Sequence, residues 1–382
     1  MHDASAGTHR HAGPHPACRP AKPRASGACA GLEACFVSVY RLRPAAHRVL
    51  PLLAHRGKPV CAHRHSVRRR PCAGRPARPA TMPVRRIEHR GVRHWLHRVP
   101  FMTTNLVIQS PAPLSDAHHK PLTALARGAR AVPLDAHALR IERADPAQRA
   151  DIAVYCGTHA LDYAFVDANK RLADFGLVAM DMDSTLITIE CIDEIADFCG
   201  LRAEVAAITE ASMRGEIADF NESVTRRVAL LAGLDASALE RVYDERLRLS
   251  PGAEAMLAGV KAAGLKTLLV SGGFTYFTER LKARLNLDYA YSNTLEIVDG
   301  KLTGRIVGEI VNAHVKARKL RETCAALGIE PERAIAMGDG SNDLAMMASA
   351  GLSVAFRAKP VVRDAASVAF DHVGLDGLLR LF

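Results

Sequence analysis

Two aspartates one residue apart, Asp181 and Asp183, follow directly on an apolar segment at residues 177–180. Residues i and i+2 of a strand point the same way, so both acids can face one reaction centre where the chain leaves a sheet. Like charges this close repel each other, and such a pair is tolerated mainly around a cation or a shared proton. An isolated pair is more often a solvated turn, since Asp is common in turns. The motifs farther along the chain favour a catalytic loop.

The chemistry that these acids allow is the hydrolysis of a phosphate monoester. An ionised carboxylate can attack phosphorus without a base, so Asp181 could form an aspartyl-phosphate. Asp183 could protonate the leaving alkoxide and later take a proton from water. The negative charge must be offset, and Mg²⁺ held by one or two carboxylates does this. Asp339, supported by Asn342 and Asp343, offers the further oxygens.

Three more residues could bind phosphate. Ser271 and Gly272 offer a hydroxyl and a sterically open backbone N–H, and Lys316 offers a point charge. Each of these signals is weak alone, because a Ser-Gly-Gly turn or a helical lysine is common. Their order along the chain strengthens them.

The elements that must position these residues alternate between strands and helices. Helix-like segments separate four apolar runs, which is typical of a mostly parallel α/β sheet: residues 177–180, 267–270, 334–337 and 352–356. Ligands of such sheets lie beyond the carboxyl ends of the strands. The polar motifs follow the first three runs, so we expect them to converge on one crevice.

Two insertions and a preceding domain complete this organisation. Residues 192–249 have helical periodicity and predict a cap over the crevice. Apolar alternation around Asp299-Gly300-Lys301 predicts a two-stranded flap at residues 292–307. Residues 102–174 predict a small α+β domain without visible chemistry, and the phosphatase-like core then occupies residues 175–382.

The first 101 residues differ from the rest in charge and composition. They carry a net charge of +17, against −6 for residues 102–382, and hold 12 of the 20 prolines. Three interpretations compete: a nucleic-acid arm, a targeting peptide, or residues not normally translated. We favour the last, with Met82 or Met102 as the start, because the Arg/Pro/Ala/His mixture has no structural period. The segment is expected to be unstructured.

Neither the cysteines nor the hydropathy indicate secretion or a membrane span. The four cysteines beyond residue 101 lack metal-ligand spacing, and reduced thiols are the default in a cytoplasmic protein. No run of about 18 apolar residues exists. We therefore expect a cytoplasmic enzyme with no membrane partner and no nucleic-acid partner.

Four ordered motifs, DMDST, SGGF, a downstream Lys and GDGSND, resemble those of the haloacid dehalogenase superfamily. Further segments extend the resemblance to its phosphoserine phosphatase family: IECIDEIA, MRGEIADF, LSPGAE and SNTLEIVDGKLTG. The match covers roughly half of the chain, from about residue 177 to its end. It implies a Rossmann-like core with a helical cap, Mg²⁺ dependence, and hydrolysis of L-phosphoserine to L-serine, the last step of serine biosynthesis.

The resemblance also implies roles for individual residues. Asp181 is similar to the nucleophile and Asp183 to the acid/base, while Asp181, the backbone carbonyl of Asp183, and Asp339 are similar to the metal ligands. The implied phosphate-binding residues are Ser271, Gly272, Lys316, Asn342 and Asp343. The implied substrate-binding residues are Glu190 for the ammonium, Arg227 for the carboxylate, and Met213 and Phe220 for the apolar closure. A zwitterionic substrate needs such an acidic and basic pair.

Some alternatives stay open at this point. His314 stands two residues before Lys316, where related sequences often carry an acidic or amide residue, and this could alter phosphate affinity. Another small phosphomonoester, or phosphate transfer to an alcohol such as homoserine, fits the same residues. Residues 102–174 resemble the N-terminal part of longer bacterial members, a degenerate amino-acid-binding regulatory fold. The oligomeric state is not determined by the sequence, and a homodimer is among the options.

Overall fold

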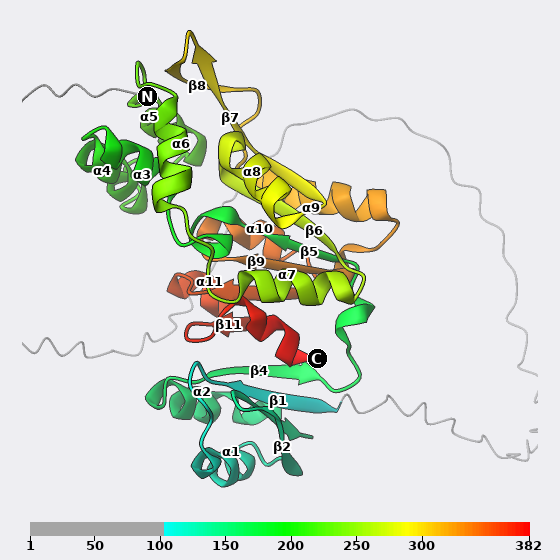
Figure 1. Ribbon diagram of the computed structural model, residues 1–382. Coiled ribbons are helices and arrows are strands. Elements are labelled where there is room, and N and C mark those ends of the chain that lie inside the picture. The colour runs from blue at the N-terminus through cyan, green and yellow to red at the C-terminus, as the bar shows by residue number, and fades with distance from the viewer. Residues whose placement is uncertain (1–102) are drawn as a thin grey trace, which may run out of the picture. The chain divides into compact units, whose positions relative to one another are not determined.

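The computed structural model describes residues 103–382 (Figure 1). Its central element is a seven-stranded sheet with the order β11-β10-β9-β5-β6-β7-β8. All neighbouring strands in it are parallel except the β7–β8 pair. The strands are β5 (Leu177–Met180), β6 (Lys266–Phe274), β7 (Tyr289–Val298), β8 (Lys301–Val307), β9 (Ala334–Gly338), β10 (Leu352–Phe356) and β11 (Val368–Phe370). The predicted α/β class is confirmed. The interpretations of residues 1–101 lie outside the described residues.

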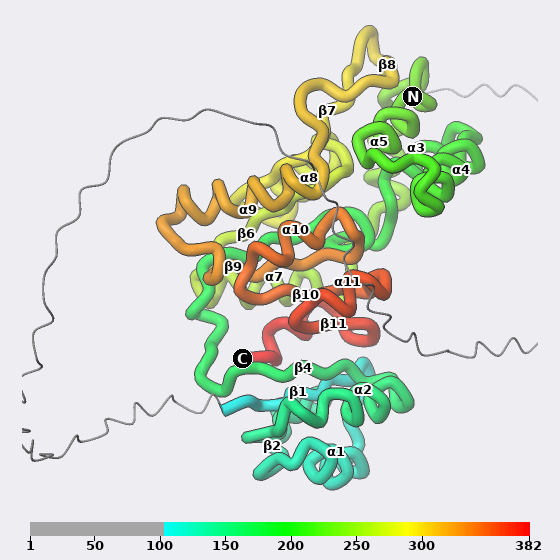
Figure 2. The backbone as a smooth tube through the Cα atoms, turned by 180° about the vertical axis from the view of Figure 1, so that it is seen from behind, coloured from blue at the N-terminus to red at the C-terminus, as the bar shows by residue number. Residues whose placement is uncertain are grey.

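Helices cover both faces of this sheet, which explains why β5 is apolar throughout. Val178 and Met180 pack into one buried cluster, and Leu177 and Ala179 into another on the opposite face. The first face is covered by α7 (Ala253–Ala262) and α8 (Thr275–Leu285), and the second by α9 (Ala313–Leu327) and α10 (Leu344–Met347). The first pair lies in front in Figure 1 and the second in Figure 2. A short helix, α11 (Pro360–Ala365), follows β10.

Two insertions lie between the core strands. Four helices follow β5: α3 (Cys191–Phe198), α4 (Arg202–Met213), α5 (Phe220–Ala229) and α6 (Ser237–Arg241). The second insertion is the hairpin of β7 and β8. The first half of β7 pairs with β6 in the core sheet, and its second half pairs with β8. Backbone hydrogen bonds join the two insertions, since Leu302 donates to Leu234 at 2.8 Å and accepts from Gly233 at 2.7 Å. The cap helices and the hairpin are therefore anchored to each other.

A second sheet lies in the N-terminal part of the described chain, with the antiparallel order β2-β3-β1-β4. Its elements are β1 (Thr104–Gln109), α1 (His119–Leu125), β2 (Arg130–Asp135), β3 (Ala138–Glu142), α2 (Arg149–Thr158) and β4 (Asp162–Asp167). Leu106 and Ile108 pack under its two helices, whereas Val107 points the other way into the main core. Successive side chains of β1 point to opposite faces, so one face of the small sheet is buried under its own helices and the other against the main core.

The contact between the small sheet and the core includes a buried carboxylate. Asp162, at the start of β4, accepts hydrogen bonds from the backbone N–H groups of Asp371, His372 and Val373 at 3.0, 2.9 and 2.8 Å. Its side chain is only 4% exposed. Gln109 adds a hydrogen bond to the carbonyl of Gly377 at 3.0 Å. Polar bonds therefore fix the small domain to the C-terminal segment. No helix among residues 103–382 is both long and apolar enough to cross a membrane.

Candidate active site

The first motif forms a tight turn at the carboxyl end of β5. The turn Met182–Leu186 contains Ser184 in a left-handed conformation with φ of 54°. This geometry is uncommon for a residue with a Cβ atom, and it costs roughly 1–2 kcal/mol. Asp181 accepts a hydrogen bond from the Met182 backbone N–H at 2.7 Å. The turn brings the side chains of both Asp181 and Asp183 to one pocket.

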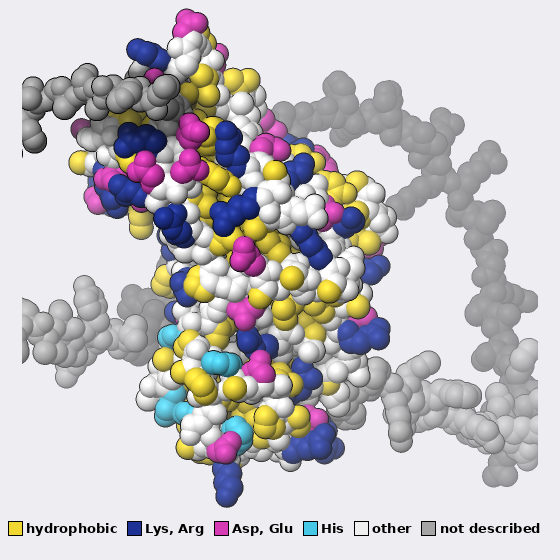
Figure 3. Space-filling view, in the orientation of Figure 1, with side chains coloured by type: hydrophobic (Ala, Val, Ile, Leu, Met, Phe, Trp, Pro, Cys, Tyr) yellow, Lys and Arg dark blue, Asp and Glu magenta, His cyan; other side chains and the backbone are white. Residues whose placement is uncertain are grey.

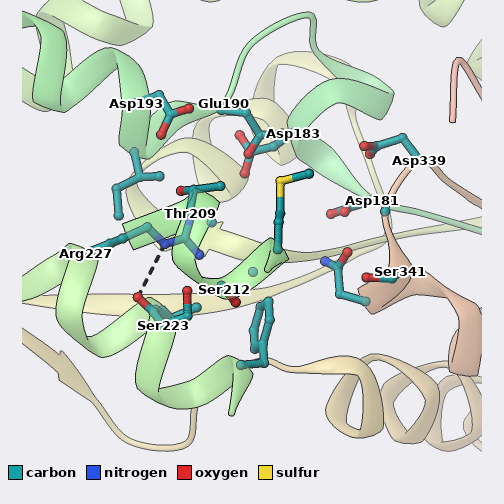
Figure 4. A pocket seen from close by; sticks show the side chains of 18 of the residues that line it. Asp181, Asp183, Glu190, Asp193, Thr209, Ser212, Ser223, Arg227, Asp339 and Ser341 are labelled. Carbon is teal, nitrogen blue, oxygen red and sulfur yellow. Dashed lines mark hydrogen bonds between the residues drawn. The ribbon is translucent and has the colours of Figure 1, made fainter. Parts of the chain in front are cut away.

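This pocket has a volume of about 370 Å³ and lies at the strand ends, as the sequence predicted. Nine of the predicted site residues line it: Asp181, Asp183, Glu190, Met213, Phe220, Arg227, Gly272, Asp339 and Asn342. Figure 4 shows its two ends, with Asp181 and Asp339 at one and Arg227 at the other. The remaining three, Ser271, Lys316 and Asp343, are at most 1% exposed and do not line the pocket.

Lys316 is fully buried and makes two ion pairs. Its Nζ lies 2.6 Å from Oδ2 of Asp181 and 2.8 Å from Oδ1 of Asp343. Burial alone would lower the pKa of Lys316, but the two carboxylates outweigh burial and raise it. Burial and the charge of Asp343 raise the pKa of Asp181, while Lys316 opposes them. The His314 side chain, by contrast, is exposed, so these two carboxylates orient the lysine.

Asp183 is held at the N-terminus of α3. Its Oδ1 accepts a hydrogen bond from the Cys191 backbone N–H at 3.1 Å. A Cβ atom on Gly273 would stand 2.6 Å from Oδ2 of Asp183, so a larger residue there would force this carboxylate to shift. Burial, followed by the charge of Glu190, raises the pKa of Asp183 to about 7. A carboxyl group with this pKa can both give and take a proton near neutral pH.

Glu190 and Arg227 lie at the cap side of the pocket. The Ser184 hydroxyl donates to Oε1 of Glu190 at 2.7 Å, which ties this carboxylate to the strained turn. Burial raises the pKa of Glu190. Arg227 donates from Nε to the Ser223 carbonyl at 3.4 Å, the dashed line in Figure 4. This leaves the outer nitrogens of its guanidinium group for a ligand.

The donor set fits a divalent metal ion that prefers oxygen ligands. Asp181, Asp339 and Asp343 each place one carboxylate oxygen within 4.8 Å of the others. The Thr185 hydroxyl donates to Oδ1 of Asp339 at 3.0 Å and orients it. Burial and the nearby charge of Asp343 raise the pKa of Asp339 to about 6, as expected where several acids lie close together. Asp183 is predicted to bind the metal through its backbone carbonyl, so it does not belong to this cluster of side-chain ligands.

The pocket also contains residues that the sequence analysis did not identify. Asp193, Thr209, Ser212 and Ser223 line its cap side, and Ser341 and Lys359 its core side. Two signals could have identified some of them. Ser223 lies one helical turn before Arg227. Lys359 follows the fourth apolar run, and ligands of parallel sheets lie beyond the carboxyl ends of such strands.

Comparisons with known proteins agree with this geometry. Residues 178–348 match the family model of the haloacid dehalogenase-like hydrolases, and residues 106–152 match a model described as a domain of unknown function (DUF4072). A protein from Polaromonas sp. named phosphoserine phosphatase is 59% identical over 215 residues, which cover 55% of this chain and 91% of that protein.

Solved structures give the same result. A probable phosphoserine phosphatase from Vibrio cholerae superposes with a TM-score of 0.63 at 37% identity, covering 74% of this chain and 86% of the other. A phospho-aspartyl intermediate analogue of phosphoserine phosphatase superposes with a TM-score of 0.51 at 37% identity, covering 55% and 99%. This chain therefore belongs to the haloacid dehalogenase-like hydrolases. Within that class, the relatives that it resembles are phosphoserine phosphatases.

Proposed function

We propose that this protein hydrolyses L-phosphoserine to L-serine and phosphate, the last step of serine biosynthesis. The observation that carries the proposal is the two-ended pocket. Its core end holds Asp181 and Asp183 beside Lys316, and its cap end holds Glu190 and Arg227. The first group suits a phosphate monoester, and the second suits an ammonium and a carboxylate. The names of the relatives favour the same substrate.

In this proposal the cap residues orient the substrate. Glu190 accepts hydrogen bonds from the substrate ammonium, and Arg227 binds the carboxylate with its planar fork. Met213, which is 70% exposed, and the half-buried Phe220 supply apolar contact. Gly272 presents a backbone N–H to the phosphate, and Ser271 and Asn342 complete the phosphate-binding set.

The chemistry then proceeds in two steps. An oxygen of Asp181 attacks phosphorus, the bond from phosphorus to the seryl oxygen breaks, and Asp183 gives its proton to that oxygen. The ionised Asp183 next takes a proton from water, which attacks the aspartyl-phosphate and releases phosphate with Asp181 regenerated. Lys316 offsets negative charge next to the nucleophile throughout. Asp343 keeps the lysine in place.

Asp181 and Asp339, with the Asp183 carbonyl, would hold Mg²⁺. The ion, when bound, offsets the charge of the phosphoryl oxygens and of the clustered acids. These carboxylate and carbonyl groups are all oxygen ligands, which suit this hard cation better than a thiolate-seeking metal.

Phosphate release from L-phosphoserine by the full chain tests the proposal, measured with Mg²⁺ and after chelation. We expect metal-dependent turnover that strongly prefers phosphoserine to phosphothreonine and sugar phosphates. Asp181→Asn should lose turnover while keeping the fold, because an amide cannot serve as the nucleophile. Turnover by Asp181→Asn in a clean preparation would refute the mechanism.

The same assay separates the alternatives. Added homoserine should leave the yield of free phosphate unchanged, and formation of phosphohomoserine would instead show transfer to an alcohol. A nucleic-acid-binding role predicts salt-sensitive DNA binding that depends on residues 1–101. On the face of the described residues that Figure 3 shows, Lys and Arg are interleaved with Asp and Glu. A cytoplasmic location and a homodimer stay predictions.

A further inference from the structure

Lys359 is a cation at the pocket that the proposed mechanism does not use. It lies between β10 and α11, directly before Pro360. Its backbone N–H donates to the carbonyl of Asp339 at 3.1 Å, so its Cα is fixed beside the end of β9. Its side chain is exposed and lines the pocket. Because the backbone is fixed and the side chain is long and flexible, the ammonium of Lys359 can reach a ligand that enters the pocket.

The side-chain charges around the pocket are unbalanced. Five carboxylates line it, from Asp181, Asp183, Glu190, Asp193 and Asp339. Among the described residues, two cationic side chains line it with them, Arg227 and Lys359. In the proposed function Mg²⁺ and a protonated Asp183 would offset the acids at the core end, which leaves Glu190 and Asp193 with these two cations. These two acids repel an approaching anion unless a nearby cation offsets them. A substrate that carries a phosphate must therefore meet a compensating positive charge.

The two cations of the pocket differ in what already holds them. Arg227 is half-buried, and it donates to the carbonyl of Ser223. Lys316, below the pocket, is held by two carboxylates and has no exposed surface. Among the described residues, no side-chain hydrogen bond or ion pair holds Lys359, although its charge acts across the pocket to lower the pKa of Glu190. Its ammonium is thus free to exchange water for a phosphate oxygen.

We infer that Lys359 is a substrate-binding residue that captures the phosphate group of the incoming phosphomonoester at the pocket entrance. The inference rests on the proposed function and deepens it. An ammonium suits this task because it is a point charge with rotatable donors and needs no fixed geometry. The residue acts on binding and on the rate of encounter, and Asp181, Asp183 and Lys316 perform the chemistry.

Three consequences follow for Lys359→Met. The KM for phosphoserine should rise about three- to tenfold, with kcat changed by less than about twofold, because the interaction is equally strong in the bound substrate and in the transition state. Inhibition by inorganic phosphate should weaken by a similar factor, since phosphate lacks the groups that Glu190 and Arg227 bind. The fall of kcat/KM with rising ionic strength should become shallower than in the wild type.

The experiment compares the full-length wild type with Lys359→Met, Lys359→Arg and Arg357→Met, with saturating Mg²⁺. Arg357 is the matched control, because it is exposed, lies two residues away and does not line the pocket. Arg357→Met should behave as wild type, and Lys359→Arg should retain most of the affinity. Thermal unfolding of each variant checks that the fold is kept.

The outcomes separate the inference from the proposed function. A wild type that fails to hydrolyse phosphoserine refutes the proposed function. An active wild type whose KM, phosphate inhibition and salt dependence are the same in Lys359→Met overturns the inference alone. An equal effect of Arg357→Met would also overturn it, because net charge would then explain the change. A loss confined to kcat would place Lys359 in the chemical step and contradict its role in capture.

Discussion

Lys316 and Asp181 form a buried ion pair, with Nζ 2.6 Å from Oδ2 and side-chain exposures of 0% and 7%. The pair lies where β5 ends and α9 begins, and it joins the proposed nucleophile to a fixed positive charge. Asp343 holds the same lysine from the other side. The nucleophile is therefore positioned before any substrate arrives.

Lys316→Met should destabilise the protein strongly, because it leaves Asp181 and Asp343 buried without their cation. We expect the free energy of unfolding at neutral pH to fall by about 3–5 kcal/mol, together with loss of activity. Denaturant unfolding measures the change. Lys319→Met is the control, since its ammonium pairs with Glu322 at the surface and should cost less than about 1 kcal/mol. Equal stabilities of the two variants would contradict this prediction.

Arg227→Lys should raise the KM for phosphoserine about tenfold or more, because a lysine cannot form the planar two-bond contact with a carboxylate. Phosphoethanolamine lacks that carboxylate, so we expect it to be turned over more slowly than phosphoserine and at nearly the same rate by wild type and variant. Arg226→Lys is the control, because Arg226 pairs with Glu222 on the exposed side of α5. Steady-state kinetics on both substrates measure these effects. A similar loss on both substrates would place Arg227 elsewhere in the reaction.

Glu190→Gln should shift the alkaline limb of the kcat/KM profile to lower pH. Asp183 must be protonated to act as the acid, so activity falls as the pH rises through its pKa of about 7. After burial, the charge of Glu190 is the largest cause that raises this pKa, and removing the charge lowers it. Glu194→Gln, whose wild-type carboxylate pairs with Arg246, should leave the limb in place. If the alkaline limb of Glu190→Gln stayed at the wild-type pH, the charge of Glu190 would not set the pKa of the catalytic acid.

Asp162→Asn should loosen the contact between the small domain and the C-terminal segment. The carboxylate accepts three backbone N–H groups, whereas an amide offers one oxygen and turns its own N–H groups toward the remaining donors. We expect the free energy of unfolding to fall by about 2–3 kcal/mol in a denaturant titration. Asp167→Asn, in the same strand, changes a carboxylate whose one partner among residues 103–382 is the nearby Asn169, and it should be nearly neutral. A denaturation midpoint unchanged by Asp162→Asn would show that this contact contributes little.

The sequence alone determined the α/β class and the strand ends at which the polar motifs lie. These properties depend on local signals: the apolar run before Asp181, the helical periods between the strands, and the rule that ligands lie beyond the carboxyl ends of parallel strands. The hairpin signal at Asp299-Gly300-Lys301 was local too, and β7 and β8 flank it. Resemblance to a family supplied the roles of Glu190 and Arg227, which neither residue shows by itself.

The tertiary structure alone decided which of these groups are buried and which are free. In sequence, Lys316 and Lys359 are two lysines near helix starts, but folding buries the first between two carboxylates and leaves the second exposed in the pocket wall. It likewise places Asp162 against backbone N–H groups more than two hundred residues away. Burial and long-range pairing arise from packing between distant segments, and no local pattern in the sequence records that packing.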